Sequence, residues 1–561
     1  MPRVLTCTEG NTEAFGIGEN VKVRRSQQAV ACKKRYAVEL GKPQRFQGIC
    51  FCMEGVRGIM KLNSSEIKED KSWWETRWTP DVALHADGVS YQAYYSAVGK
   101  AHYTGKDLTE VRSPQRKLVP DKVGLGQYEK TSLRGIAIKA KENGKHRFQD
   151  LYRCLNAPFL HSCWADLNKK AASGVDEVTA EAYEEDLAAN IQALSGRLKA
   201  KRYRAKLVRR CYIPKENGKE RPLGIPALED RLVQLACAKL MTAIFEADFL
   251  DNSYGYRPNR SAKDAVNDLR FNLQFGKYGY IVEADIKGFF DHMDHDWLLR
   301  MLKERTDDAA FLNLIRKWLK AGILDTDGMV IHPETGTPQG GIVSPVLANV
   351  YLHFALDLWF ENVVKAHCKG DAMIIRYADD FVCAFRYRKD AIKFFKALPK
   401  RLDKFDLSVE PEKTGLMRFS RFHPSRRRRI IFLGFETYWT KDLKGEVRVM
   451  QRTARKKLQG ACKRIKDWVK EYRHLKGMKF ITALNRRLRG HYNYYSVVGN
   501  LRSLWRFYSW AIECAFKWLN RRGGKRKSFT WKAFSRAIER LGLAKPKLPI
   551  STKRHRVFSL I

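Results

Sequence analysis

Two segments of the chain bring carboxylates to the end of an apolar run. Residues 280–286 read Tyr-Ile-Val-Glu-Ala-Asp-Ile, and residues 374–385 read Ile-Ile-Arg-Tyr-Ala-Asp-Asp-Phe-Val-Cys-Ala-Phe. The two-residue period of a strand places Ile281, Glu283 and Asp285 on one face. The second segment predicts a β-hairpin with Asp379 and Asp380 at its tip, because two apolar runs meet there.

Adjacent aspartates repel each other unless water or a cation neutralises them. The apolar runs on both sides of Asp379 and Asp380 favour neutralisation by a cation over solvation by water. Nucleotidyl transfer needs carboxylates that hold two Mg²⁺ ions about 3.5–4 Å apart, and Asp285, Asp379 and Asp380 could supply them. Mg²⁺, or Mn²⁺ in its place, prefers such hard oxygen ligands. The alternative is an ordinary turn, where Asp is common.

The elements that would position these acids lie in the middle of the chain. Residues 1–130 show little sustained periodicity, and we assign no function to this N-terminal extension. From Arg147 apolar residues recur at helical spacing, and the pattern alternates between helix and strand to about residue 440. We therefore expect a mixed α/β body over residues 131–445.

After Gly445 the pattern changes to basic amphipathic helices over residues 446–545, followed by a basic tail at 546–561. Three apolar stripes are expected, at Leu458, Cys462, Ile465, Val469, Tyr472 and Leu475; at Ile481, Leu484, Leu488, Tyr492 and Tyr495; and at Leu504, Trp505, Tyr508, Ile512, Phe516 and Leu519. Arg486, Arg487 and Arg489 should project away from the second stripe and bind RNA. The aromatic residues themselves are read mostly as the core of this bundle.

Charge points to a polyanionic partner. The chain has 105 Lys and Arg against 61 Asp and Glu, a net +44, and residues 451–561 have 30 against 4, a net +26. No apolar run is long enough to span a bilayer, and no signal peptide is recognisable, so we expect a cytoplasmic protein without a membrane partner. The twelve cysteines show no paired C-x-x-C spacing, which argues against a zinc site.

The carboxylate hairpin and its neighbours resemble the group II intron reverse transcriptases and maturases of bacteria. Tyr377-Ala378-Asp379-Asp380 resembles the family's Tyr-Ala-Asp-Asp box. The other motifs, in the family's order, are Gly174-Val175-Asp176; Ile213-Pro214-Lys215; Arg221 to Pro226; Tyr254-Gly255-Tyr256-Arg257-Pro258; Glu283 to Asp291; Thr337 to Pro345; Glu412-Lys413-Thr414; Phe432-Leu433-Gly434-Phe435; and Leu488 to Tyr495. They cover roughly residues 145–540.

The resemblance implies roles for individual residues. The catalytic residues would be Asp285, Asp379 and Asp380, and the metal would be held by Asp285, Ile286, Asp379 and Asp380. The incoming nucleotide would be bound by Lys215, Arg221, Phe290, Gln339 and Lys413. Phe290 would exclude a ribose 2′-hydroxyl, with core packing as its alternative, since Phe289 beside it is equally apolar. Lys413 would protonate the leaving pyrophosphate, or else be a phosphate contact or a surface lysine.

The implied fold is a right-hand polymerase, with α/β fingers and palm built on an antiparallel catalytic sheet and followed by an α-helical thumb and maturase bundle. The implied activity is RNA-directed DNA synthesis from an RNA template, a DNA primer and deoxynucleoside triphosphates, with intron RNA as a further partner. Two alternatives are a related polymerase detached from any intron and used in defence or repair, and an RNA-binding splicing factor with a relict polymerase. A C-terminal His-Asn-His endonuclease is not expected, because no cysteine follows Cys514. The sequence does not predict the intron, the DNA target, the priming route or the oligomeric state.

Overall fold

The computed structural model describes residues 132–214, 218, 220–337, 339–442, 444–521 and 528–548. The N-terminal extension at 1–130, the predicted nucleotide ligand Lys215 and most of the basic tail at 546–561 lie outside the described residues. The assignments made for these three segments therefore stay predictions from the sequence.

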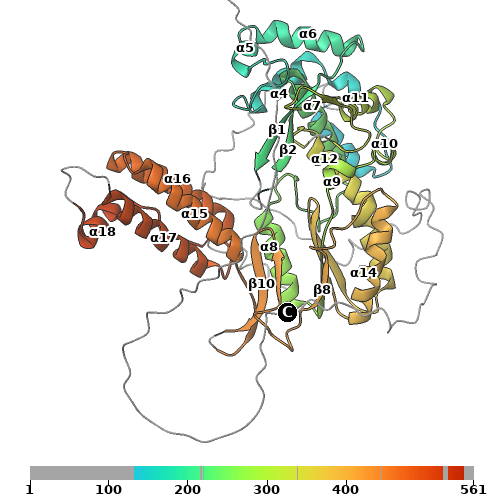
Figure 1. The fold of residues 1–561 in the computed structure, drawn as a ribbon. Helices are drawn as coiled ribbons and strands as arrows, with labels where there is room; N and C mark the ends of the chain where they lie inside the picture. The colour runs from blue at the N-terminus through green and yellow to red at the C-terminus, as the bar shows by residue number, and fades with distance from the viewer. Residues whose placement is uncertain are drawn as a thin grey trace, which may run out of the picture. The chain divides into compact units, whose positions relative to one another are not determined.

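A four-stranded antiparallel sheet carries the carboxylates. It contains β3 (Tyr280–Asp285), β6 (Ala372–Tyr377), β7 (Asp380–Phe385) and β8 (Gly415–Arg418), in the order β6-β7-β3-β8 (Figure 1). In the β6–β7 hairpin Tyr377 pairs with Asp380, which leaves a turn of two residues. The predicted hairpin with acids at its tip is confirmed.

Both faces of this sheet are buried, which explains why its strands are apolar at nearly every position. On β7, Phe381 and Cys383 belong to a large core shared with the helices of the α/β body. Val382 and Ala384, which alternate with them, belong to a second core that includes residues of α8 (Ala262–Phe275) and β10 (Phe435–Lys441). Each apolar run thus fills two cores through the two-residue period of a strand.

A second sheet has the order β2-β1-β4-β5 and contains β1 (Val208–Pro214), β2 (Glu220–Ile225), β4 (Ile323–Leu324) and β5 (Val330–Ile331). The helices of this body, in chain order, are α3 (Leu133–Glu142), α4 (Ala157–Asp166), α5 (Ala180–Glu184), α6 (Leu187–Lys199), α7 (Leu228–Phe245), α8, α9 (Phe289–His292), α10 (His295–Lys303), α11 (Ala309–Leu319), α12 (Ser344–Leu352), α13 (Lys365–His367) and α14 (Arg388–Asp403). A 3₁₀ turn η2 (Leu151–Cys154) and two π-helical turns, η3 (His353–Asp357) and η4 (Phe360–Val364), complete it.

A third sheet, of three antiparallel strands, joins this body to the helices that follow. Its order is β11-β10-β9, with β9 (Arg429–Phe432), β10 and β11 (Val447–Thr453). The expectation that helices begin directly after Gly445 is wrong for Val447–Thr453, which pair along the whole length of β10. Val449 and Gln451 on this strand are buried, and their packing outweighs the basic residues Arg448 and Arg452 on either side of them.

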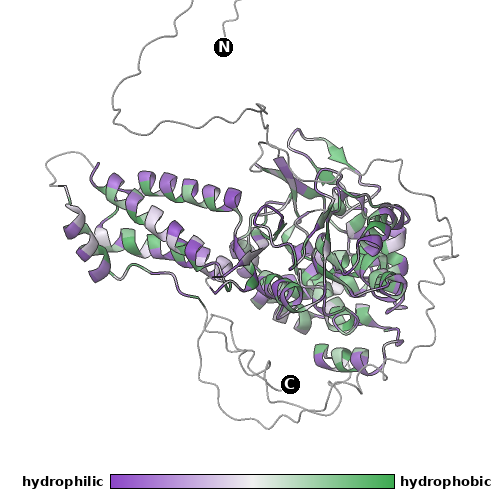
Figure 2. Ribbon diagram, turned by 90° about the horizontal axis from the view of Figure 1, so that it is seen from below, coloured by the Kyte–Doolittle hydropathy of each residue, from purple (hydrophilic) through white to green (hydrophobic). Residues whose placement is uncertain are grey.

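The C-terminal part is a helical bundle, drawn orange to red in Figure 1: α15 (Arg455–Tyr472), α16 (Gly477–Tyr495), α17 (Leu501–Leu519) and α18 (Trp531–Arg540). The three predicted stripes supply about half of its core, and hydrophilic residues cover the outer faces (Figure 2). Trp505 is an exception, 41% exposed, because its neighbour Leu504 faces inward and adjacent helical residues point about 100° apart. Helix α18, whose Phe534 and Ile538 close the bundle, was not predicted.

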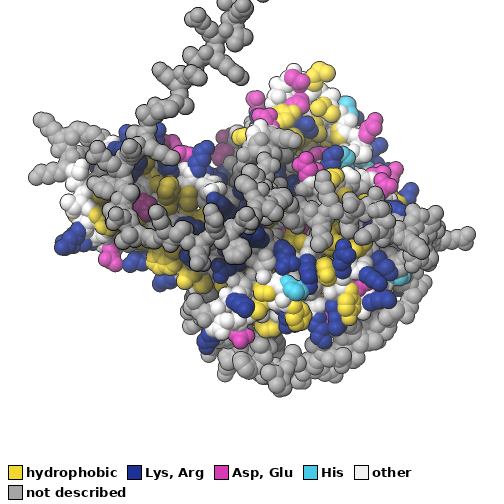
Figure 3. All heavy atoms as spheres, turned by 60° about the horizontal axis from the view of Figure 1, so that its bottom comes forward, with side chains coloured by type: hydrophobic (Ala, Val, Ile, Leu, Met, Phe, Trp, Pro, Cys, Tyr) yellow, Lys and Arg dark blue, Asp and Glu magenta, His cyan; other side chains and the backbone are white. Residues whose placement is uncertain are grey.

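Basic side chains are prominent on the surface. On the face drawn in Figure 3, dark blue Lys and Arg side chains clearly outnumber magenta acidic ones in the lower part of the view. Among the described helices, none is both long enough and apolar enough to cross a membrane.

Candidate active site

Strand pairing brings two of the three predicted acids together. Asp285, the last residue of β3, lies opposite Asp380, the first residue of β7. Asp379 occupies the turn before Asp380, so all three acids lie at one end of the sheet. Sequence positions 95 residues apart thus meet because the strands are antiparallel.

The turn between β6 and β7 is held in an unusual backbone conformation. Ala378 has a φ of 56°, in the left-handed region that L residues rarely adopt. Gly255 lies directly behind it, and a Cβ on Gly255 would be 2.4 Å from the Ala378 backbone nitrogen. The flanking segment is bonded to β6, since Tyr254 N donates to Arg376 O and Arg376 N donates to Asn252 O, both at 2.9 Å. The close approach requires glycine at position 255.

A buried arginine on β6 fixes the same turn from inside. Arg376 and its ion-pair partner Asp357 are both 0% exposed, and two nitrogens of Arg376 reach the Asp357 carboxylate at 2.5 and 2.7 Å. Arg376 also donates to Asn349, to Ser253 and, at 3.1 Å, to the carbonyl of Ala378. Removing one partner of such a buried pair typically costs about 3–5 kcal/mol. Arg376 therefore fixes the position of the turn that carries Asp379.

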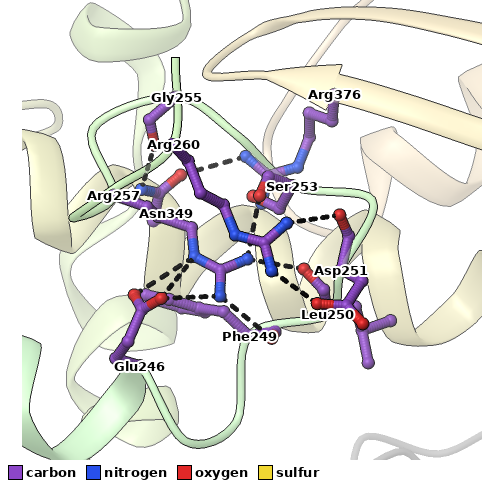
Figure 4. A network of polar contacts seen from close by, with 10 residues as sticks. All are labelled: Glu246, Phe249, Leu250, Asp251, Ser253, Gly255, Arg257, Arg260, Asn349 and Arg376. Atoms are coloured by element: carbon purple, nitrogen blue, oxygen red, sulfur yellow. Dashed lines mark hydrogen bonds and ion pairs between the residues drawn. The ribbon is translucent and has the colours of Figure 1, made fainter. Parts of the chain in front are cut away.

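Figure 4 shows this network from close by. Asn349 donates to the carbonyl of Gly255 at 2.7 Å, while Arg257 binds Glu246 and the carbonyl of Ser253. This support was not predicted from the sequence. A signal was present, because an arginine interrupts the apolar run of residues 374–385.

The three carboxylates hold more negative charge than their surroundings neutralise. The protein atoms packed around the Asp380 carboxylate desolvate it and, together with the charges of Asp379 and Asp285, raise its pKa to about 7. Burial is also the main reason why the pKa of Asp379 is raised. Lys413 donates a hydrogen bond to Asp285, and that bond raises the pKa of Lys413. A bound divalent cation would relieve this repulsion.

The donor set fits magnesium rather than a softer metal, because it consists of oxygen atoms. Among the described residues no three His, Cys, Asp or Glu side chains form a ready-made metal cage. Mg²⁺ does not need one, because it keeps waters and substrate phosphates among its ligands. Ile286 could contribute only its backbone, since its side chain is 2% exposed and belongs to the core. On either side of Ile286, the Lys287 amide donates to the carbonyl of Ser408 and the Asp285 carbonyl accepts from the amide of Glu410. The Ile286 carbonyl takes no part in these two bonds.

The two phenylalanines after β3 face different ways. Phe289 is buried in the core, whereas Phe290 is half-buried at its edge, with the rings 5.4 Å apart. The carbonyl of Phe290 accepts a hydrogen bond from the backbone of Thr337 at 2.8 Å. Core packing is therefore the role of Phe289, which leaves Phe290 available beside the loop that follows Thr337.

That loop lies against β2, the strand that carries Arg221. Gly224 N donates to the carbonyl of Gln339 at 2.5 Å. Gly340 has a φ of 118°, and a Cβ there would be 2.3 Å from the Gly224 oxygen. Arg221 is exposed on the same strand, and its charge lowers the pKa of Asp379 against the raising effect of burial. Arg221, Gln339 and the acids thus border one region.

The predicted RNA-binding arginines lie on α16, and Arg486, Arg487 and Arg489 are all exposed. Arg487 has its guanidinium 4.1 Å from the ring centre of Trp468 on α15. A second group of cations surrounds Trp518, with Lys470, Arg473 and Arg521 each 5.6 Å from its ring centre. In the part of the chain that the structure describes, these four stacked cations form no ion pair with a carboxylate. Such cations are available to phosphates.

Comparison with known proteins gives consistent matches. The model of the family described as reverse transcriptase (RNA-dependent DNA polymerase) matches residues 213–437. Protein YkfC of Escherichia coli (strain K12) is 32% identical over 353 residues, which cover 56% of this chain and 90% of YkfC. Group II intron-encoded protein LtrA of Lactococcus lactis subsp. cremoris is 39% identical over 226 residues, covering 39% of this chain and 37% of LtrA.

Weaker similarity extends to Nuclear intron maturase 1, mitochondrial, of Arabidopsis thaliana, which is 30% identical over 95 residues, or 17% of this chain and 13% of that protein. The chain therefore spans nine tenths of YkfC but little more than a third of LtrA. Relatives named for introns and maturases do not favour a detached polymerase or a relict one.

Proposed function

The chain belongs to the group II intron reverse transcriptases, a family of RNA-directed DNA polymerases, and on that premise we propose how its own residues carry the reaction. The observation that supports the assignment is the meeting of Asp285, Asp379 and Asp380 at one end of the β3–β7 pair. We assign these acids and the Ile286 carbonyl to two Mg²⁺ ions. When bound, the ions would activate the primer 3′-hydroxyl and stabilise the leaving pyrophosphate.

The residues around the acids would bind and orient the nucleotide. Arg221 is exposed on β2 and would neutralise the triphosphate with its planar guanidinium. The loop of Gln339 and Gly340 is fastened to the same strand and would let backbone groups approach the nucleotide closely. Lys215, which precedes β2, stays a prediction for the same task.

Phe290 and Lys413 would act on different parts of the nucleotide, Phe290 on the sugar and Lys413 on the leaving pyrophosphate. Phe290, at the edge of the core, would close the space that a ribose 2′-hydroxyl needs. Lys413 keeps its proton because the hydrogen bond to Asp285 raises its pKa. It would hold that proton at Nζ for the leaving pyrophosphate.

A maturase role would use the helical bundle. Its exposed Arg486, Arg487 and Arg489 and the cations around Trp518 form a basic face suited to the phosphates of folded intron RNA. RNA template, DNA primer and target, and deoxynucleoside triphosphates are the remaining proposed partners, and a cytoplasmic location is proposed with them.

The test is primer extension on an RNA template. Purified protein should extend a DNA primer only with Mg²⁺ or Mn²⁺, and Asp285→Asn or Asp380→Asn should lower the rate by orders of magnitude, because each removes charge that fixes the metals. Asp371→Asn, at the opposite end of the sheet beside β6, is the matched control and should extend normally. Near-normal extension by either active-site variant would contradict the proposal.

A further inference from the structure

Three tyrosines from distant segments lie beside the catalytic acids. Tyr256 comes from the loop before α8 and is 53% exposed, and Tyr494 comes from the last turn of α16 and is 42% exposed. Tyr377 is half-buried at the end of β6, two residues before Asp379. None of the three belongs to the buried residues of a core. Such rings, apolar on their faces and polar at the hydroxyl, are suited to contact a binding partner.

Tyr256 lies on the side of the acids where Arg221 of β2 is found. Its ring centre is 6.5 Å from that of Tyr377, and its φ of 57° is uncommon for a bulky residue. Burial and then the charge of Asp379 raise its pKa, while the charge of Arg221 lowers it. Tyr256 therefore lies within reach of both charged groups, at the end where the triphosphate is expected.

Tyr494 joins the helical bundle to the third sheet, at the turn between β9 and β10. Its hydroxyl donates to the carbonyl of Leu433 at 3.1 Å, and its ring stacks on Phe435 at 6.0 Å. Burial, then Tyr495, Tyr377 and Asp380, raise its pKa to about 12. The phenol therefore stays neutral and adds no negative charge to the acids.

The turn that Tyr494 binds is itself strained. Leu433 and Gly434 form the two-residue turn between β9 and β10, since Phe432 pairs with Phe435. Both have positive φ values, 48° and 78°, although leucine rarely adopts this conformation. Strain of this kind persists where surrounding contacts impose it and clusters at functional sites. The Tyr494 hydroxyl is one of those contacts.

We propose that Tyr256, Tyr377 and Tyr494 form one aromatic track that binds the growing end of the nucleic acid. Tyr256 would contact the incoming nucleotide and Tyr494 the terminal primer nucleotide, with Tyr377 between them. Aromatic rings suit this task, because a polymerase must accept every base and each base has a stacking face. The inference rests on the proposed function and adds the residues that align the two reactants.

The proposal predicts that the two outer tyrosines affect different constants, KM for the nucleotide and the dissociation constant of the primer–template. Tyr256→Ala should raise KM for the nucleotide about 10-fold and leave primer–template affinity within about twofold. Tyr494→Ala should weaken primer–template binding about 10-fold, with little change in KM for the nucleotide. Tyr256→Phe keeps the ring and should resemble the parent. Tyr494→Phe loses only the bond to Leu433 and should fall between the parent and the alanine variant.

Tyr387→Ala provides the matched control. Tyr387 is 43% exposed at the start of α14, beyond the opposite end of β7 from the acids, so its loss should change neither constant. Primer–template affinity is measured without nucleotide, by fluorescence anisotropy, and melting temperature is recorded for each variant. An alanine variant that unfolds is replaced in the comparison by the leucine variant of the same tyrosine, which removes the aromatic ring but keeps more of the side-chain volume, and the same division of effects is expected.

The result that would overturn the track is an equal effect of both alanine variants on both constants, or no effect beyond that of Tyr387→Ala. Failure of the parent protein to extend a primer with Mg²⁺ would instead contradict the proposed function. The affinity comparison between Tyr494→Ala and Tyr387→Ala still decides the track in that case, because it involves no chemistry.

Discussion

Phe290 and Gly340 show how single residues shape the nucleotide region. Their segments are joined, since the carbonyl of Phe290 accepts from Thr337 three residues before Gly340. Phe289 takes the buried position, which frees Phe290 to face the loop. Gly340 lets that loop touch β2, because the Cβ of any other residue at this position would overlap the backbone oxygen of Gly224.

Phe290→Val should admit ribonucleotides far better than the parent while the protein stays folded. The smaller side chain would open the space that a 2′-hydroxyl needs. Extension rates with ribonucleoside and deoxyribonucleoside triphosphates give the discrimination ratio, and Phe289→Leu is the control for a core change. Full discrimination in the Phe290 variant, or its unfolding, would mean that Phe290 is a packing residue.

Gly340→Ala should raise KM for the nucleotide at least about 10-fold, because the loop must move away from β2 to relieve a 2.3 Å contact with backbone. Gly328→Ala is matched to it: Gly328 also has a positive φ, 85°, but nothing lies within 4 Å of its Cβ position. Steady-state kinetics on both variants separate the clash from the backbone strain. Equal KM values in the two variants would show that the contact with β2 does not position the nucleotide.

At the level of elements, helix α16 has two chemically different faces. Ile481, Leu484 and Leu488 fill the core of the bundle, while the arginines between them stay outside. Arg487 is more constrained than the sequence suggested, because it stacks on Trp468. Stacking holds the guanidinium in place and leaves its edges free to bind phosphate.

Replacing Arg486, Arg487 and Arg489 with Ala should weaken intron RNA binding and flatten its salt dependence. Each lost phosphate contact should reduce the slope of log affinity against log salt by about 0.7–0.9. Primer extension at saturating substrate should persist, since the acids lie elsewhere.

The control removes the same charge from another helix, by replacing the exposed Arg388, Lys389 and Lys396 of α14 with Ala. Affinity is measured at several salt concentrations, together with splicing at limiting Mg²⁺. An unchanged slope in the α16 variant, or the same change in the α14 variant, would contradict RNA binding by this face.

For the whole molecule, buried histidines link stability to pH. Burial lowers the pKa of His353 and of His491 to about 4. A lowered pKa means that the neutral form stabilises the fold above the unfolded value of 6.5, and that this contribution is lost as pH falls towards 4. Asp230 and Asp248 act in the opposite direction, because burial raises their pKa values to about 6.

His491→Phe should therefore reduce the loss of stability between pH 7 and pH 5. His491 stacks on Phe507 at 3.9 Å, so phenylalanine can take its place without opening a cavity. The variant should retain about 1–2 kcal/mol more of its unfolding free energy at pH 5 than the parent does, relative to pH 7. Chemical denaturation at both pH values measures this, with the exposed His161→Phe as control. A pH dependence identical to that of the parent would disprove the role of His491.

The sequence by itself determined the features that depend on near neighbours in the chain. The hairpin of residues 372–385 and the apolar stripes of α15 to α17 follow from strand and helix periods, which are set within a few residues. The family motifs also predict Asp285, Asp379 and Asp380 as the acids of the site without reference to strand pairing.

Only the tertiary structure decided the features that depend on long-range packing. Local propensity does not show that Val447–Thr453 add a strand to β10, because that choice is made by the surface they cover. Likewise the sequence gives no reason for Arg376 to stand in an apolar run, because its ion-pair partner Asp357 is brought to it only by the fold. Tyr494 reaches Leu433 only because the end of α16 packs against the turn between β9 and β10. Such contacts join residues 19 to 61 positions apart, beyond the range over which a local period can act.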